Sequence, residues 1–238
     1  MSVDPWFSSW NYELFRFLFS HIPPSNAIDD WCGTLISNSP LSCWIFAFCF
    51  YYFWTINDSQ RLARRRYLID STIALALGVM ITIVLRPWVH WPAPVLNKSF
   101  QPLFPQHLWG NGNGNCFPSH STLVYFTIAV GFWRLSRSLS VALAAVTLAL
   151  ISFPRVYEGG HYPIDVAFSC GLTILTLLLA WHWPVLGKVS NRLAEDNSPA
   201  GALRQLVLFG FLFELAEGFR SVEFLFGVAH HMFAPLLI

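Results

Sequence analysis

Long apolar runs constrain this chain more than any other feature of its sequence. Residues 67–85 and 162–183 are each almost continuously apolar, and either run approaches the about 20 residues that a helix needs to cross a bilayer. Of all residues, 55% are hydrophobic and only 11% are charged, whereas soluble domains carry about 25% charged residues. The sequence therefore predicts an integral membrane protein, and the expected fold class is all-α.

Five apolar segments are candidates for spanning helices, and they predict a bundle of about five to six transmembrane helices. The first includes residues 41–56 and is expected to begin upstream, near residues 32–36, because the apolar run alone is short. The other four expected spans are residues 67–85, 119–133, 138–153 and 162–183. Residues 6–20 are amphipathic and too polar to cross readily, so an N-terminal interfacial helix is expected there.

The predicted organisation of the chain follows these segments. Residues 1–27 are expected to form the interfacial helix, and residues 28–184 the transmembrane bundle that carries the candidate site. Residues 185–202 are hydrophilic and read as a cytoplasmic linker. Residues 203–238 form an accessory apolar segment that spans once, lies flat on the membrane or docks on the bundle; the sequence leaves these alternatives open.

Basic residues fall at alternate turns between the expected spans, which predicts the orientation. Three basic groups share one side: Arg61–Arg66, Arg134 with Arg137, and Lys188 with Arg192. By the positive-inside rule this side is cytoplasmic, so residues 86–119 and 154–162 share the opposite face. The net charge of +1 supplies no field that attracts nucleic acid, so the expected partners are the lipid bilayer and a membrane lipid.

The segment 153–165 places an arginine, a histidine and an aspartate at the start of an apolar helix. Pro163 suits the first turn of a helix, so we expect the helix to begin just before it and Asp165 to reach back to the His161 ring. A carboxylate on one ring nitrogen fixes the tautomer and raises the basicity of the other nitrogen. Arg155 offers a planar fork for an oxyanion. The pattern indicates phosphate chemistry with a histidine nucleophile; the alternative is a capped helix with a surface histidine and an ordinary ion pair.

Two further patterns lie at the same predicted membrane face. Arg86-Pro87 ends the second span, and Phe117-Pro-Ser-His120 precedes the third. With the segment 153–165, they resemble the three motifs of the type 2 phosphatidic acid phosphatase (PAP2) superfamily: Lys-x6-Arg-Pro, Pro-Ser-x-His and Ser-Arg-x5-His-x3-Asp. The third motif reads Pro154-Arg155-x5-His161-x3-Asp165 here, with its serine replaced. The stretch Asn11-Tyr-Glu-Leu-Phe15 also resembles the bacterial lipid-diphosphate phosphatases of this family.

The resemblance implies a catalytic mechanism. His161 attacks the phosphorus and forms a phosphohistidine, while Asp165 orients the ring and stabilises its charge. His120 protonates the leaving oxygen and then activates water. The implied phosphate ligands are Arg86, Arg155 and Ser119. The mechanism calls for no metal ion and no other cofactor.

The chain departs from the family pattern at two motifs. The lysine position of the first motif holds Val79, and either Lys98 or His90 in the following loop is a candidate substitute. The second motif is one residue short and allows two alignments. With a deletion, His120 takes the acid/base position; without one, Ser121 takes it. We favour His120, because serine is not an acid at neutral pH.

The expected function is hydrolysis of a lipid phosphate or polyprenyl diphosphate at the extracytoplasmic face of a plasma (inner) membrane. A polyprenyl diphosphate such as the bacterial undecaprenyl carrier is the first substrate, and phosphatidic acid or phosphatidylglycerol phosphate the second. Two alternatives are a lipid phosphotransferase that uses the same histidine and a catalytically silent binder or transporter of lipid phosphates. The sequence does not predict the oligomeric state.

Two further features receive structural interpretations. Asp70 lies in a span near its expected cytoplasmic end, so pairing with an arginine of the segment 61–66 is favoured over a role in transport. The five cysteines are scattered, with no CxxC pair. Small buried hydrophobes are the favoured interpretation for those in apolar runs, and a Cys32–Cys116 disulfide is a less favoured alternative for the other two.

Overall fold

The computed structural model describes residues 5–22, 25–37, 39–86, 88–89, 91–104 and 115–194, together with residues 201, 203, 207 and 210. Within these residues every regular element is helical. In chain order the longer elements are α1 (Pro5–His21), α2 (Asn26–Ser37), α3 (Ser39–Thr55), α4 (Arg61–Leu85), α5 (His120–Gly131), α6 (Arg137–Val146), η5 (Thr147–Ser152), α7 (Phe153–Tyr157), α8 (Pro163–His182) and α9 (Pro184–Ala194). Three short 3-10 turns are η1 (Pro94–Leu96), η2 (Gln101–Leu103) and η4 (Phe132–Arg134). His90 and most of the segment 203–238 lie outside the described residues.

Three helices are long and apolar enough to cross a membrane. They are α4, the continuous helix Arg137–Tyr157 formed by α6, η5 and α7, and α8. The expected spans at 41–56 and 119–133 are also helical, but the apolar part of α3 covers only Ile45–Thr55 and α5 has 12 residues. Three apolar helices are therefore established, and the total of five to six spans stays a prediction.

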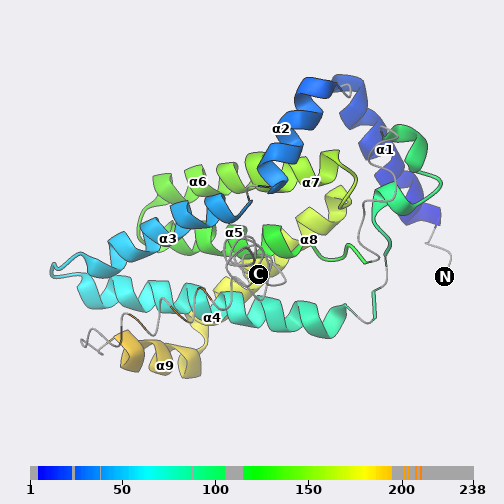
Figure 1. The fold of residues 1–238 in the computed structure, drawn as a ribbon. Helices are drawn as coiled ribbons and strands as arrows, with labels where there is room; N and C mark the ends of the chain where they lie inside the picture. Colours follow the sequence, from blue (N-terminus) through cyan, green and yellow to red (C-terminus); the bar gives the residue numbers. More distant parts are fainter. Residues whose placement is uncertain are drawn as a thin grey trace, which may run out of the picture.

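The bundle is built around α4, which runs beneath α3, α5 and α6 in the view of Figure 1. Helix α5 packs against both α4 and α8. Hydroxyl groups join α5 to α8, because Thr127 Oγ1 and Thr173 Oγ1 lie 2.9 Å apart and both side chains are fully buried. Helix α3 completes this core through the ring of Phe46, whose centroid is 5.1 Å from that of Tyr125. The hydroxyl contact between Thr127 and Thr173 is of the kind that holds helices together in a membrane, because apolar side chains contact lipid as favourably as they contact another helix.

The basic turns meet at one end of the bundle, as predicted. The guanidinium of Arg134 lies over the rings of Tyr67 and Trp181, at 5.4 and 4.6 Å from their centroids. Residues from α4, η4 and α8 therefore share this end, and α9 lies beside α4 there (Figure 1). The expected pairing of Asp70 is also present, with Arg66 Nε 4.0 Å from Asp70 Oδ2.

The sequence did not predict the contact that holds α9 in place. Asp70 is fully buried and accepts a short hydrogen bond from Ser190 Oγ of α9. The hydrophilic stretch after residue 184 thus begins as a helix docked on α4. A buried carboxylate requires such partners, since its desolvation is costly.

The helix before the third motif is longer than expected. The predicted span ended at residue 153, but the helix continues to Tyr157, so Pro154 and Arg155 are helical. The wider π-helical turn η5 ends at Ser152, two residues before Pro154. A proline removes one backbone donor and clashes with the preceding turn, and a π turn is one of the few ways a helix accommodates this.

Substitution of Gly131 is expected to test the close contact between α5 and α4. A Cβ atom at Gly131 comes 2.7 Å from Ser71 Cβ, whereas a Cβ atom at Gly171 on α8 meets nothing within 4 Å. Gly131→Ala should lower the free energy of unfolding by about 1–3 kcal/mol through overpacking. Gly171→Ala should leave it unchanged or raise it by up to about 1 kcal/mol, because alanine favours a helix. Unfolding midpoints in one detergent measure both variants, and equal shifts would contradict this packing.

Candidate active site

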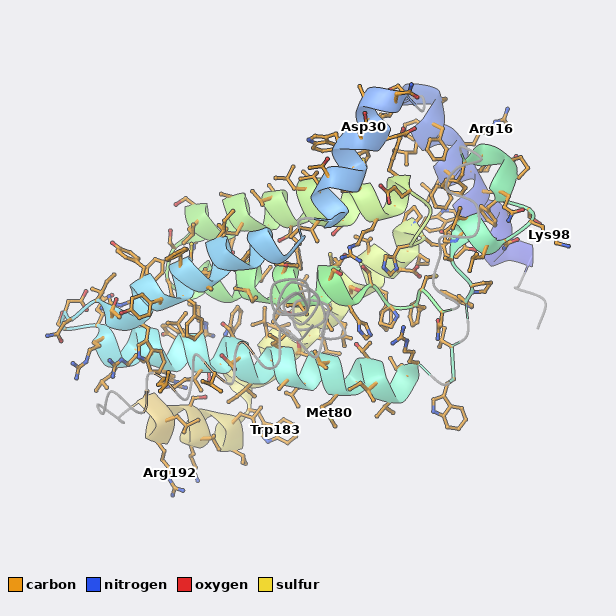
Figure 2. The ribbon with its side chains drawn as sticks, viewed as in Figure 1. Arg16, Asp30, Met80, Lys98, Trp183 and Arg192 are labelled. Carbon is orange, nitrogen blue, oxygen red and sulfur yellow. The ribbon has the colours of Figure 1, made fainter. Side chains whose placement is uncertain are left out.

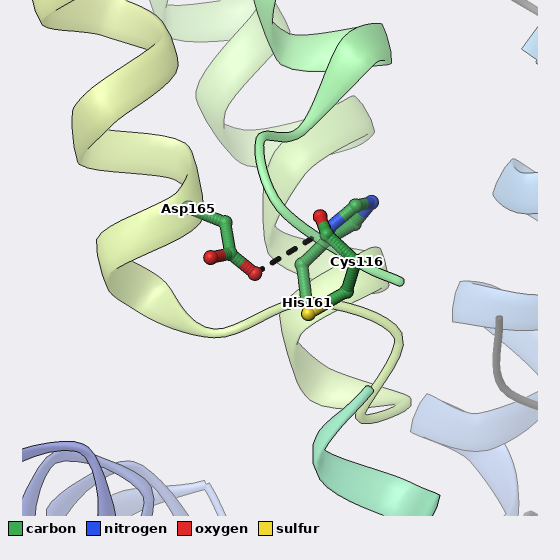
Figure 3. A group of neighbouring side chains, drawn as sticks. All are labelled: Cys116, His161 and Asp165. Carbon is green, nitrogen blue, oxygen red and sulfur yellow. Dashed lines mark hydrogen bonds and ion pairs between the residues drawn. The ribbon is translucent and has the colours of Figure 1, made fainter. Parts of the chain in front are cut away.

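The His161 side chain is held by a backbone carbonyl. Its Nδ1 atom lies 2.8 Å from the carbonyl oxygen of Cys116 (Figure 3). A carbonyl oxygen only accepts hydrogen bonds, so Nδ1 carries the proton and donates it. In the neutral ring the lone pair then resides on Nε2, the nitrogen that points away from this contact. This hydrogen bond fixes the tautomer in which Nε2 is the nucleophilic and basic atom.

Asp165 lies beside His161 but does not make the hydrogen bond that the sequence suggested. Its Oδ2 atom is 3.6 Å from His161 Nδ1, which is within ion-pair range of a protonated ring. The same oxygen accepts the backbone N–H of Tyr162 at 2.8 Å, in a capping box at the start of α8. The carboxylate is fully buried. The Cys116 carbonyl therefore orients the ring, and the carboxylate supplies negative charge that stabilises an imidazolium.

The Cys116 thiol completes a buried cluster with these two residues. Ligand atoms of Cys116, His161 and Asp165 all lie within 4.8 Å of one another. Burial, followed by the negative charge of Asp165, raises the pKa of the Cys116 thiol far above its usual range. The thiol is thus neutral, and His161 Nδ1 donates its proton to the Cys116 carbonyl oxygen. Cys32 and Cys116 are both free, so the alternative disulfide is not formed.

Arg155 and His161 are joined through the glycine turn between α7 and α8. The carbonyl oxygen of Arg155 accepts the backbone N–H groups of Gly160 and His161, at 2.9 and 3.1 Å. Gly159 adopts a φ of 72°, a left-handed conformation that favours glycine. A Cβ atom at Gly159 comes 2.9 Å from the Phe104 ring, so both conformation and space require glycine. Gly159 and Gly160 therefore close a turn that fixes His161 relative to the end of α7.

Asn115 connects the first and second motifs, and the sequence did not single it out. Its side-chain amide donates to the carbonyl oxygens of Arg86 and Val89, at 3.0 and 2.9 Å. Its side-chain oxygen accepts the backbone N–H of Phe117 at 3.2 Å. Arg86, at the end of α4, in turn donates from Nη2 to the Asn115 carbonyl oxygen at 3.5 Å. Because Cys116 follows directly and its carbonyl oxygen accepts a hydrogen bond from His161, one hydrogen-bonded segment connects the end of α4 to His161.

Ser119 and His120 lie at the start of α5, against α8. The Ser119 carbonyl oxygen accepts the Ser169 hydroxyl at 2.9 Å, which ties this helix start to α8. The buried Ser119 hydroxyl lies 3.0 Å from Thr122 Oγ1. His120 is partly exposed, whereas Ser121 is buried. A group that exchanges protons with a ligand and with water needs access, and this difference favours His120 for that role.

The structure does not bring a substitute for the first-motif lysine to His161 among the described residues. Val79, in the lysine position of the first motif, is buried in the apolar core among residues of α4 and α5. Lys98 is exposed and points outward at the end of the molecule that holds α1, whereas Arg192 lies at the opposite end (Figure 2). His90 is outside the described residues. In the described part of the chain the arginines Arg86 and Arg155 are therefore the cations that the motifs bring to this end.

Taken together, these contacts gather five residues from three sequence motifs at one end of the bundle: Arg86, Ser119, Arg155, His161 and Asp165. A nucleophilic nitrogen, a buried carboxylate and planar cations form a set suited to transfer of a phosphoryl group.

Comparison with known proteins agrees with this geometry. The model of the PAP2 superfamily matches residues 67–187, a range that contains all five of these residues. No curated protein and no solved structure matches the chain. The chain therefore belongs to the PAP2 superfamily, whose members generally hydrolyse phosphate esters.

Proposed function

We propose that this protein is a membrane lipid phosphatase that hydrolyses a lipid phosphate or a polyprenyl diphosphate through a phosphohistidine, without a metal ion. The observation that carries the proposal is the hydrogen bond from His161 Nδ1 to the Cys116 carbonyl, which leaves the lone pair on Nε2. Binding alone does not need a nitrogen prepared in this way. The buried Asp165 carboxylate 3.6 Å from the same ring adds the charge that a phosphorylated imidazole requires.

In the first step, Nε2 of His161 attacks the phosphorus and the bond from phosphorus to the leaving oxygen breaks. His120 gives its proton to that oxygen, which leaves as the lipid alcohol or, from a diphosphate, as the lipid monophosphate. In the second step, His120 takes a proton from water, the water oxygen bonds to phosphorus and the N–P bond breaks. Free phosphate is released and both histidines return to their starting states.

Most of the stabilisation of the transition state falls to the phosphate ligands. The charge spreads over three equatorial oxygens, and planar guanidinium groups match two such oxygens at once. Arg86 and Arg155 serve this role in the proposal. The Ser119 hydroxyl and the positive end of the α5 helix dipole add to this stabilisation.

The proposed site of action is the extracytoplasmic face of a plasma membrane. Arg134 lies beside the start of α4 and the end of α8, whereas Arg86 and His161 lie at the other ends of these helices, and the positive-inside rule supports a cytoplasmic location for the basic end. A polyprenyl diphosphate is the first proposed substrate. The resemblance of residues 11–15 to bacterial lipid-diphosphate phosphatases supports this choice over phosphatidic acid or phosphatidylglycerol phosphate.

Phosphate release in detergent with a chelator present tests the proposal. The detergent-solubilised full chain is assayed on polyprenyl diphosphate, phosphatidic acid and phosphatidylglycerol phosphate. Chelator-resistant release of free phosphate supports hydrolysis, and the substrate with the largest kcat/KM identifies the lipid. A phosphorylated acceptor in place of free phosphate indicates a phosphotransferase, and lipid binding with neither product overturns the enzymatic proposal.

Replacement of Arg155 by lysine is expected to cost much of the activity while the fold is kept. Its backbone carbonyl, which holds His161, is unchanged by the substitution. The planar fork is lost, and removal of one such donor costs about 10²–10³ in kcat. The control is Arg192→Lys on α9, at the other end of the molecule (Figure 2). The measurement is kcat of both variants on one substrate. An Arg155→Lys enzyme whose kcat is within about threefold of the wild-type value would contradict the role of Arg155 as a phosphate ligand.

A further inference from the structure

An apolar groove lies between α1 and the two helices that carry the third motif. It has a volume of about 300 Å³. One wall is formed by Leu14, Phe17 and Leu18 of α1, and the other by residues of η5, α7 and α8, among them Leu148 and Val166. Phe17 is 64% exposed and Leu148 is 41% exposed, so the rim of the groove opens outward. Leu148 belongs to a helix that is long and apolar enough to cross the membrane.

The groove starts next to the catalytic segment and runs along the helices. Val156 and Pro163 line it, and they flank Arg155 and His161 in the sequence. From there Leu148 lies seven residues back along the helix from Arg155, a distance of about 10 Å at the rise of a helix. Val166 lies one turn into α8 on the same face as Pro163. The groove therefore leads from the phosphate-binding end into the apolar part of the bundle, the direction that the tail of a bound lipid must take.

Two structural features mark the groove as a built site. The π-helical turn η5 contributes Leu148 and Ser152 to its wall, and π turns are rare and frequent at functional sites. The Ser152 hydroxyl lies 2.9 Å from Thr122 Oγ1, which contacts the Ser119 hydroxyl at 3.0 Å. This chain of hydroxyls links the groove wall directly to the proposed phosphate ligand at the start of α5.

Helix α1 is fixed in place as the outer wall. Phe15 is fully buried, and its ring contacts those of Phe104 and Tyr162 with centroids 5.3 and 6.1 Å apart. The adjoining face of this helix turn presents Leu14, Phe17 and Leu18 to the groove, and Leu18 also packs against the cluster around Phe15. The N-terminal helix is thus attached to the start of α8 by one face and covers the groove with another.

We propose that this groove is the binding site for the hydrocarbon chain of the lipid substrate, entered from the bilayer between α1 and η5. The inference rests on the proposed function and assigns the binding of its substrate's hydrocarbon chain to the residues that line the groove. The groove supplies apolar contact and the motif residues supply the charge. Small phosphate esters contact only the motif residues. The groove therefore makes the enzyme favour substrates that carry a long hydrocarbon chain.

Filling the groove tests the proposal through selectivity. The variants Leu148→Trp and Val166→Trp are compared with Leu175→Trp, a control on α8 whose side chain is 52% exposed and lies outside the groove. For each, kcat/KM is measured on a long-chain polyprenyl diphosphate and on p-nitrophenyl phosphate. The ratio of the two values should fall by about tenfold or more in the groove variants and stay constant in the control. A ratio that is unchanged in all three variants overturns the inference while leaving the phosphatase activity intact.

A cross-linking measurement tests whether the hydrocarbon chain lies in the groove, and it requires neither turnover nor a bulky substitution. A long-chain lipid phosphate with a diazirine in its tail is photolysed with the full-length His161→Ala protein, and the modified peptides are mapped. Modification of α1 around Phe17 and of η5 around Leu148 is expected, and excess unlabelled long-chain lipid phosphate should suppress it. Modification only at α3 or α9, or labelling that the competitor leaves unchanged, contradicts the groove even if the protein proves not to be a phosphatase.

Discussion

His161→Ala is expected to abolish phosphate release. The substitution removes Nε2, the atom that bonds to phosphorus in the proposed first step. The neighbouring Cys116 thiol is a poor replacement, because burial and the charge of Asp165 raise its pKa and keep it neutral. Loss of the covalent route should lower kcat by about 10⁴-fold or more, as for removal of other nucleophiles. Phosphate release in detergent micelles measures the effect.

Cys116→Ala is the matched control for this variant. The residue orients His161 through its backbone carbonyl, which alanine retains. The Cys116→Ala enzyme should therefore keep most of its activity. The two variants together show whether the imidazole of His161 or the thiol of Cys116 is needed for phosphate release. Residual turnover in His161→Ala at the level of Cys116→Ala would show that the imidazole is not the group that attacks phosphorus.

His120→Ala is expected to have the second-largest effect. The residue is the first of α5, follows the proposed phosphate ligand Ser119 and is partly exposed. Loss of a general acid and base costs about 10²–10⁴ in rate, and the loss should be smaller for a substrate whose leaving group is already acidic. We expect His120→Ala to cleave p-nitrophenyl phosphate more nearly like the wild type than it cleaves a lipid monophosphate.

Ser121→Ala separates the two alignments of the second motif. Ser121 is buried beside His120 and is no acid at neutral pH, so its substitution should change kcat by less than about threefold. If Ser121→Ala loses activity and His120→Ala keeps it, the gap-free alignment is the right one and the acid and base must be sought elsewhere.

Much of the fold and the meeting of the motifs could be predicted from the sequence. Apolar runs predicted helices at α4 and α8 because only a regular helix satisfies its own backbone in an apolar medium. Alternation of basic turns predicted that Arg134 would lie near the start of α4 and the end of α8, and its contacts with Tyr67 and Trp181 confirm this. That alternation also placed Arg86 and His161 at one end, where Asn115 and Cys116 connect them.

The contacts that the sequence missed depend on tertiary packing. A backbone carbonyl leaves no mark in a sequence, so the role of Cys116 in fixing the tautomer of His161 was not visible. The side chain of Asn115 bridges segments more than twenty residues apart. It is one of three asparagines that alternate with glycine in residues 110–115, so the sequence did not distinguish it from the other two. The hydrogen bond from Ser190 to Asp70 pairs residues that are 120 positions apart. The continuation of the helix through Pro154 required a π turn that no residue pattern predicts.

The most direct test of the account is to trap the covalent intermediate and locate its phosphorus. The wild-type protein is mixed with a phosphorus-labelled lipid phosphate, quenched in alkali within the first turnover and digested, and the labelled peptide is sequenced and examined by phosphorus NMR. The account predicts an acid-labile phosphohistidine at His161, bonded through Nε2, because the Cys116 carbonyl holds the proton on Nδ1. Phosphorus on Nδ1 of His161, on another residue, or free phosphate released with no labelled protein would contradict it.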